Sequence, residues 1–552
     1  MGLFSLLNVG TRGLSAAQLS MDVAGQNISN ADVEGYSRKR LNLNADYRMD
    51  GSFGQMGFGV EVESIERVRN TLIDSQIQRQ NHEVGMYTEI DQTLQRVESI
   101  FVEPSATGIQ HFIDQFFDSW QNLANNPADV ASRTMVKTNA EILSNVFHSL
   151  SGELRDLGQS RNTEIGVRVK RVNELSQEIF NLNNEIMAIE INKQNANDSR
   201  DKRDQLLKEI ATLVDTDVVE NEYGQVTVIT GGSIIVSPVG FQKLELTTNS
   251  FVRSDGTNGT DVGLRFADSK LICNLKGGQI KGLFESRDII IPAFEVELDT
   301  LANALVTKIN QLHETGYNQS GYSGMQFFNP AGTGASDISL SASIISSIQN
   351  IAAASGGVVS ANGPLGSLAA THTFGGPLFN LGRRNIVMNS VEVQTPTGTM
   401  LQENVDYHID HVNGTLQMLH GGYDTTDLTI NFNYNSGAFK GVGDNTNAVA
   451  IAQLRQQLTM TPDNLGNAQS SFTDYYSSMI GRLGLAKNEA ASNLETRTFL
   501  VDQLNRQQDS IAGVSLDEEM GNIIKAQHTY QAAARLMSTT STMLDILMTI
   551  GQ

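Results

Sequence analysis

The two ends of this chain carry the pattern that most limits its fold. Apolar or small residues recur there at alternating steps of four and three, which places them on one seam of an α-helix. The N-terminal seam comprises Leu3, Leu7, Gly10, Leu14, Ala17, Met21, Ala24 and Ile28. The C-terminal seam comprises Leu516, Met520, Ile523, Gln527, Tyr530, Ala534, Met537, Ser541, Leu544 and Met548.

Two such helices at opposite ends of one chain predict that they pair with each other. Pairing closes the chain into an out-and-back hairpin with other domains strung between its ends. Asp517, Glu518 and Glu519 begin the second helix, where carboxylates favourably oppose the helix dipole. Periodicity alone leaves a second interpretation open, in which each helix docks separately on a core.

Length and charge restrict the class of protein further. A chain of 552 residues is too long for one core, and about three or four domains are expected. The net charge of −22 opposes nucleic-acid binding. The sequence contains no run of 18 or more apolar residues, so it predicts no membrane-spanning helix. The N-terminus lacks the features of a cleavable signal, so we expect any export to use an uncleaved one.

The sequence offers little chemistry for catalysis. The single cysteine, Cys273, excludes an internal disulfide and lies in an apolar run, so we expect a buried, inert thiol. Asp406, His408 and Asp410 would share one strand face beside His411, which suggests at most weak cation binding; an exposed polar strand face is the favoured interpretation. We therefore predict no enzyme, no cofactor and no metal site.

The interior predicts a mixed fold. Heptad spacing continues in 163–192, and a further helix spans the region of Leu298 to Ile309. Residues 218–275 and 386–435 alternate like strands, and Asn413-Gly414 is typical of a hairpin turn. The expected fold is a long α-helical, coiled-coil-like hairpin formed by both termini and middle helices, with β-rich outer domains inserted.

The expected division has four parts. A terminal helical core joins 1–45 to 508–552, and a helical bundle joins 46–217 to 276–330 and 441–507. Residues 218–275 form a β-rich segment, and 331–440 form an inserted β-rich outer domain that we expect to be removable.

A motif follows the first helix. Asn27, Ile28 and Asn30, followed by Gly35-Tyr36, resemble the block that the rod, hook and hook-associated axial proteins of the bacterial flagellum share. Gln26 and Glu34 depart mildly from that pattern. A matching C-terminal block is present, with Gly513 to Met520, Gln527, Tyr530, Gln531 and Ala532.

Interior blocks narrow the resemblance to hook-associated members of this family. Their order along the chain is Arg203-Asp204-Gln205, 276–283, Arg287-Asp288, 313–317 and 443–448. The resemblance covers 1–330 and 441–552, and leaves 331–440 outside it.

The resemblance implies a structural protein of the hook–filament junction that self-assembles through its paired terminal helices. It implies a ring or helical layer of about eleven copies, type III export with a flagellar export chaperone, and contacts with the hook protein and the second junction protein, FlgL. The implied assembly interface comprises Leu7, Leu14, Met21, Asn27, Ile28, Asn30, Gly35, Tyr36, Leu516, Met520, Ile523, Gln527, Tyr530, Met537 and Leu544. Two alternatives stay open: an extracellular filament-borne enzyme or adhesin acting through 331–440, and a hook or distal-rod protein.

Overall fold

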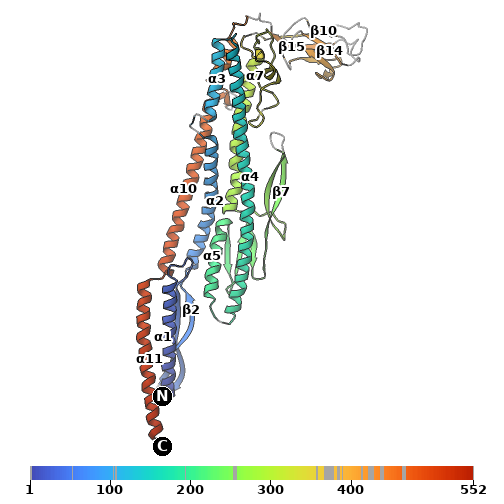
Figure 1. The fold of residues 1–552 in the computed structure, drawn as a ribbon. Coiled ribbons are helices and arrows are strands. Elements are labelled where there is room, and N and C mark those ends of the chain that lie inside the picture. The colour runs from blue at the N-terminus through green and yellow to red at the C-terminus, as the bar shows by residue number, and fades with distance from the viewer. Residues whose placement is uncertain are drawn as a thin grey trace.

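The computed structural model is a long rod, with both chain termini at one end and a small β unit at the other (Figure 1). It describes residues 3–51, 54–102, 105, 108–192, 194–252, 258–332, 334–355, 358–365, 378–381, 386–387, 390–411, 414–419, 428–435, 441–462 and 468–550.

The two ends of the chain pair as predicted. α1 (Leu3–Ser29) and α11 (Leu516–Ile550) lie side by side, and an antiparallel ribbon of β1 (Lys39–Gly51) and β2 (Gly54–Arg67) packs on α1 (Figure 1). We call these four elements the terminal segment. The expected boundary at residue 45 falls within β1. Because β1 pairs with β2, residues 46–67 belong to the terminal segment and not to the bundle.

The middle of the rod is a bundle of long helices. Its main members are α2 (Thr71–Phe101), α3 (Ile109–Asn125), α4 (Val130–Glu190), α7 (Ile291–Thr315) and α10 (Phe472–Ala512). The 61 residues of α4 correspond to a length of about 90 Å. Shorter helices pack against these, namely α5 (Asn197–Leu213), α6 (Gln279–Glu285), the π-helical η1 (Ser286–Ile290) and α9 (Thr446–Gln453).

An aromatic cluster fills the upper part of the bundle. Its rings come from α3 and from the loop after α7, and each is at most 1% exposed: Phe116, Phe117, Trp120, Phe327 and Phe328. The ring centroids of Trp120 and Phe327 are 5.3 Å apart. Trp120 therefore lies in the core of the bundle.

A β-rich region covers the lower half of α4. One sheet has the order β3 (Asp217–Glu220), β4 (Val226–Thr230), β5 (Ser233–Ser237), β6 (Gly240–Phe241), and a separate ribbon pairs β7 (Leu244–Val252) with β8 (Asn258–Phe266). They share a second core with the seam of α4 that the heptad spacing predicts, including Ile165, Val172, Leu175 and Ile179.

The inserted β unit has its own small core. One sheet has the order β12 (Met400–Leu401), β11 (Glu392–Gln394), β15 (Leu428–Asn435), β9 (Val358–Leu365); the other has β10 (Leu378–Asn380), β14 (Thr415–Met418), β13 (Tyr407–Asp410). β13 and β14 form the hairpin that Asn413-Gly414 predicts. Gly414 has φ +67°, whereas Asn413 lies outside the described residues.

The start of the insert differs from the expected boundary at 331. Six side chains after that position lie in the bundle core: Ala335, Ile338, Leu340, Ile344, Ile351 and Ala353. This stretch contains the short helices α8 (Ala342–Ser346) and η2 (Ile348–Asn350). Its apolar residues follow no regular helical period, so the sequence pattern did not distinguish it from the inserted strands. The chain returns to the bundle near α9 and a short ribbon of β16 (Met460–Pro462) and β17 (Ala468–Ser470).

Candidate assembly site

Small residues form the contact between α1 and α11. Ala16, Ala17 and Ala24 of α1 and Ala526 of α11 are at most 6% exposed. A Cβ atom on Gly10 would lie 2.7 Å from Met537 Cγ, so this glycine lets the two helices approach closely. The pair therefore buries little apolar area for its length.

The predicted seam residues occupy two different places in this arrangement. On α1, the small seam residues Gly10, Ala17 and Ala24 are buried, whereas the large ones are only partly buried, namely Leu7, Leu14, Met21 and Ile28. On α11, Ile523, Met537 and Leu544 are partly buried, in line with the buried Glu519, Ala526 and Thr540. Leu516, Met520, Gln527 and Tyr530 are exposed, with the first two 54% exposed.

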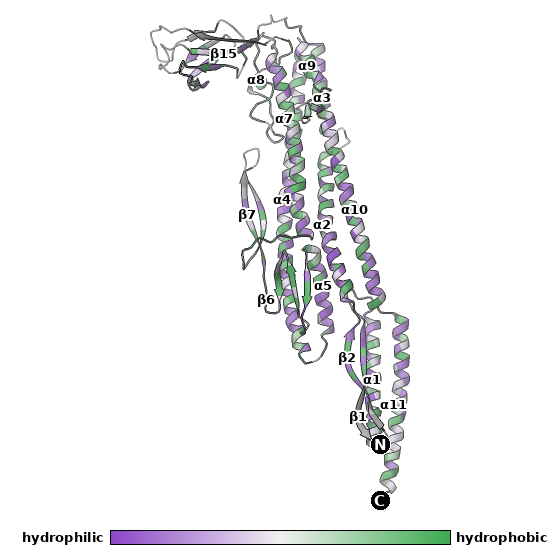
Figure 2. Ribbon diagram, turned by 180° about the vertical axis from the view of Figure 1, so that it is seen from behind, coloured by the Kyte–Doolittle hydropathy of each residue, from purple (hydrophilic) through white to green (hydrophobic). Residues whose placement is uncertain are grey.

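Large apolar side chains on α11 face away from α1. Figure 2 shows hydrophobic residues along α11 to its C-terminal end. At 100° per residue, Leu516, Met520 and Ile524 lie on one flank of the buried row, and Met543 and Leu547 lie on the other. All five are at least 50% exposed, so the helix carries two uncovered apolar flanks.

The motif after α1 closes a specific turn. The Asn27 side chain bonds both backbone groups of Lys39: its Nδ2 donates to Lys39 O, and Lys39 N donates to its Oδ1, each at 2.9 Å. The Tyr36 hydroxyl donates to the same Oδ1 at 2.9 Å. Asn30 Nδ2 donates to Gln26 O at the end of α1. These contacts fix the direction in which β1 leaves α1.

Gly35 and Tyr36 suit this crowded position. Gly35 has φ +80°, and a Cβ atom there would overlap the Gln205 side chain of α5. Burial, with the negative charges of Asp198, Asp201 and Glu519, raises the pKa of Tyr36 to about 12. The phenol therefore stays protonated and keeps its donor.

We call residues 34–39 and 65–69 the elbow, because they join the terminal segment to the bundle. Ser37 N and Ser37 Oγ donate to Asp201 of α5 at 3.1 and 2.6 Å. Arg67 Nη1 donates to Asp201 at 2.7 Å and to Asp204 at 2.8 Å. On the other side, Arg38 Nε donates to Glu519 Oε1 of α11 at 2.8 Å.

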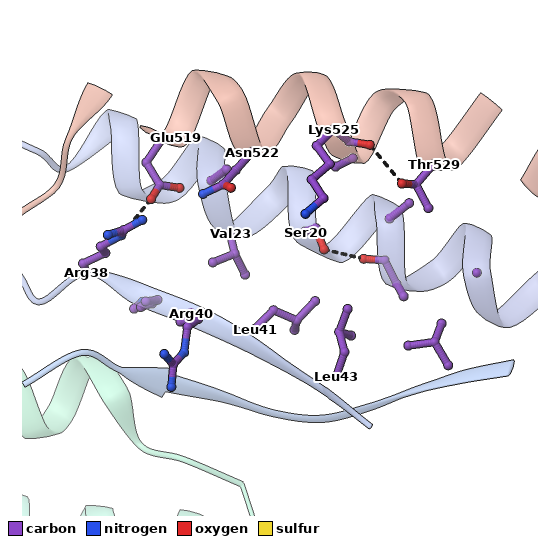
Figure 3. Close-up of a pocket in the computed structure, with 17 residues that line it drawn as sticks. Ser20, Val23, Arg38, Arg40, Leu41, Leu43, Glu519, Asn522, Lys525 and Thr529 are labelled. Carbon is purple, nitrogen blue, oxygen red and sulfur yellow. Dashed lines mark hydrogen bonds and ion pairs between the residues drawn. The ribbon is translucent and has the colours of Figure 1, made fainter. Parts of the chain in front are cut away.

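A groove lies between α1, α11 and β1 (Figure 3). Its volume is about 480 Å³, and small residues of α1 line it: Gly13, Ala16, Ala17, Ser20 and Ala24. Leu41 and Leu43 of β1 form one wall, while Lys525 and Thr529 come from α11. Figure 3 shows the ion pair of Arg38 with Glu519 at one end of this groove.

The residues that the sequence offered for metal binding or thiol chemistry lie outside the terminal segment. His411 Nε2 is 3.2 Å from Glu403, and His408 Nδ1 is 3.0 Å from the amide oxygen of Asn404. Within the described ranges, no group of three His, Cys, Asp or Glu residues is arranged to hold a metal ion. Burial raises the pKa of the Cys273 thiol to about 12. No helix in the described part of the chain has both the length and the hydropathy of a membrane span.

The sequence pattern did not predict the α5 carboxylates that bind the elbow and β1. Asp198, Asp201 and Asp204 recur every three residues on α5, and all three contact the terminal segment. In the sequence, the Arg203-Asp204-Gln205 block indicates a family resemblance and no contact partner. The signal that could have revealed them is acidic residues on one helix face, with Lys39, Arg67 and Arg69 as cationic partners.

Comparison with known families gives three matches along the chain. Residues 94–328 match the family described as flagellar hook-associated protein FlgK helical domain. Residues 7–36 match the flagella basal body rod protein family, and residues 509–550 match the flagellar basal body rod FlgEFG protein C-terminal family. The two terminal matches fall on α1 with its turn and on α11.

Whole-chain relatives agree with these matches. Flagellar hook-associated protein 1 of Bacillus subtilis (strain 168) is 26% identical, covering 98% of this chain and 97% of the relative. The proteins of the same name from Salmonella typhimurium and Escherichia coli K12 are each 26% identical, covering 99% of this chain and 100% of the relative.

A solved structure supports the fold. The flagellar hook junction protein FlgK from Burkholderia pseudomallei superposes with a TM-score of 0.56 at 18% identity, covering 79% of this chain and 100% of that one. The ordered matches along the sequence, the relatives that align over nearly the whole chain and the shared fold show that this chain is similar throughout to flagellar hook-associated protein 1, and they support a structural role in the bacterial flagellum.

Proposed function

We propose that this chain builds the hook–filament junction by self-assembly of its terminal segment. The observation that carries the proposal is the pair of exposed apolar flanks on α11. Met543 and Leu547 are at least half exposed, on a helix whose other face contacts Gly10 and Gly13 of α1. Contiguous apolar surface of this kind marks a site of protein contact.

Two flanks require two neighbours. A surface that meets a different surface on the next copy makes a heterologous contact, which repeats into rings or helical layers. We propose a layer of about eleven copies, the number that the resemblance to flagellar axial proteins implies. The interface then includes the exposed Leu516, Met520, Gln527 and Tyr530, while the partly buried Ile523, Met537 and Leu544 hold α11 against α1.

The remaining assignments follow from the similarity to flagellar hook-associated protein 1 and stay proposals. They are secretion by the flagellar type III route, an export chaperone, and contacts with the hook protein and FlgL. We also propose a purely structural role without catalytic activity, nucleic-acid binding or membrane insertion. The inserted β unit lies at the opposite end of the rod from α11 (Figure 1), so it projects away from the proposed interface.

Complementation of a strain that lacks this gene tests the proposal. The deletion strain should have bare hooks and release flagellin into the medium, and the wild-type gene should restore filaments. Met543→Asp places a carboxylate on an apolar contact, where unpaired burial is costly. We expect this variant to be exported without supporting filaments.

Arg535→Glu is the matched control. Arg535 is exposed and already charged, and at 100° per residue it lies on the face of α11 opposite the buried row, between the two flanks. This variant should support filaments. Filaments of normal length in the deletion strain would refute the junction role, and full rescue by Met543→Asp would remove this flank from the interface.

A further inference from the structure

One turn of α5 contacts three separate parts of the chain through consecutive residues. Arg203 donates to Gly224 O in the turn between β3 and β4. Asp204 accepts from Arg67, and Gln205 donates to Glu34 O. Consecutive residues on a helix point about 100° apart. This turn therefore joins the sheet beside the bundle to both chain segments of the elbow.

Asp201 and Asp204 carry most of the contact with the elbow. Asp201 accepts from the backbone and the hydroxyl of Ser37, and also from Arg67. Asp204 pairs with Arg67 and, at 3.0 Å, with Arg69. The four charged side chains are 11–17% exposed. Removing one partner from such a group leaves a charge buried and uncompensated.

The contact is one-sided. Away from α5, a polar groove of about 880 Å³ separates residues 31–36 from the turn between α10 and α11. Few direct contacts cross toward that turn: Arg38 N donates to Ala512 O at 3.4 Å, and Arg38 pairs with Glu518 and Glu519. The elbow is thus fastened to α5 and open toward α10.

We propose that Asp201 and Asp204 are positioning residues for assembly, fixing the direction in which the terminal segment leaves the bundle. This rests on the proposed function, since a fixed direction matters only if α11 meets neighbouring copies. A preset direction lowers the ordering cost of each contact formed during assembly. The contacts of Asp201 and Asp204 also keep the elbow ordered in the monomer, so only the part of the terminal segment beyond the elbow depends on assembly for its order.

Amide hydrogen exchange on the full-length monomer tests the elbow directly. In Asp201→Asn/Asp204→Asn, exchange across 34–39 and 65–69 should accelerate roughly ten- to a hundredfold, the factor expected for loss of charge-assisted hydrogen bonds. Exchange in α2 and α4 should not change. Arg67→Gln removes the cation that Asp201 and Asp204 share, and it should also accelerate exchange in the elbow. It replaces the double variant in this test if the double variant folds poorly.

Glu209→Gln provides the matched control. Glu209 also lies on α5 and pairs with an arginine, Arg171 of α4 at 2.7 Å, but both residues belong to the bundle. This variant should leave the elbow unchanged. Unaltered elbow exchange in both the double variant and Arg67→Gln would overturn the proposal, as would equal acceleration in α4, which would indicate a general effect on stability.

Filament growth supplies the second readout. In the deletion strain, the double variant should be exported normally and yield about tenfold fewer filaments, in proportion to the weakened contact, whereas Glu209→Gln should yield normal numbers. Normal filament numbers with the double variant would overturn the positioning role. Failure of the wild-type gene to restore filaments would instead refute the proposed function, and the exchange measurement would still decide whether α5 holds the elbow.

Discussion

The bundle and the terminal segment use apolar residues in opposite ways. In the bundle, the largest apolar side chains lie inside, and Trp120 and Phe116 are 0% exposed. In the terminal segment, the buried row is mostly alanine, whereas Leu516 and Met548 of α11 are 54% and 70% exposed. The bundle therefore completes its core within one chain, and the terminal segment has apolar surface left for another.

Replacement of the inserted β unit should give the largest change in stability, and it tests which residues belong to the bundle core. Replacing 358–435 with a Gly/Ser linker should preserve the bundle, because Ser355 N donates to Asp444 at 2.8 Å and the two ends are close. Replacing 331–440 should instead remove buried residues such as Ile338, Ile344 and Ile351, at a cost on the order of 5–10 kcal/mol. That loss is comparable to the whole stability of a domain.

Thermal unfolding followed by circular dichroism distinguishes the two replacements. Only the longer replacement should abolish the cooperative transition of the bundle. The sequence pattern predicts that the longer segment is removable, whereas the packing of 335–351 in the bundle core predicts that it is not. Equal melting of both variants would show that this stretch contributes little to the core.

Trp120→Ala should give the next largest effect. The side chain lies among Phe116, Phe327 and His313, so its removal leaves a cavity and should destabilise the bundle by about 3–5 kcal/mol. Urea unfolding of the purified chain measures this change. A loss below 1 kcal/mol would contradict the view that the bundle depends on this aromatic cluster.

His313 should make the bundle sensitive to acid. Its Nε2 accepts from Ala352 N at 2.9 Å, so Nδ1 carries the proton and donates to Met325 O. Burial lowers the pKa of His313 from 6.5 to about 4. The neutral ring favours the fold, so its contribution is full above pH 6.5 and about 3 kcal/mol is lost as pH falls to 4.

Unfolding free energies measured between pH 7 and about 4 in a Glu314→Gln background test this dependence. That background is needed because burial raises the pKa of Glu314 to about 7, and its contribution changes with pH in the opposite sense, being lost as pH rises. His313→Gln should flatten the curve, whereas replacing the exposed His528 of α11 should not. An unchanged slope in His313→Gln would assign the acid sensitivity to other groups.

Met543→Ala should give the smallest change in stability. The side chain is 50% exposed, so the free energy of unfolding of the monomer should shift by less than about 0.5 kcal/mol. Filament growth should nevertheless weaken, because the same side chain lies on a flank proposed to meet another copy. A large loss of monomer stability would place Met543 in an internal contact instead.

Periodicity in the sequence predicted the helices of the terminal segment and the pairing of its ends. The predicted N-terminal seam correctly included the buried Gly10, Ala17 and Ala24, but its large members are only partly buried and the buried Ala16 lies outside it. Periodicity also missed Asp201 and Asp204, because their partners Ser37 and Arg67 lie more than 130 residues away in sequence. Only the fold brings these groups together.

Amide hydrogen exchange, compared between monomer and assembled protein, tests the central claim that the terminal segment is completed by neighbouring copies. The buried area of an alanine-rich pair does not readily offset an ordering cost of roughly 1–2 kcal/mol per residue. We predict rapid exchange across 3–28 and 516–548 in the monomer, beside protected α2 and α4, and protection of both ranges after assembly. Strong protection of both ranges in the monomer, equal to that of the bundle helices, would contradict the claim.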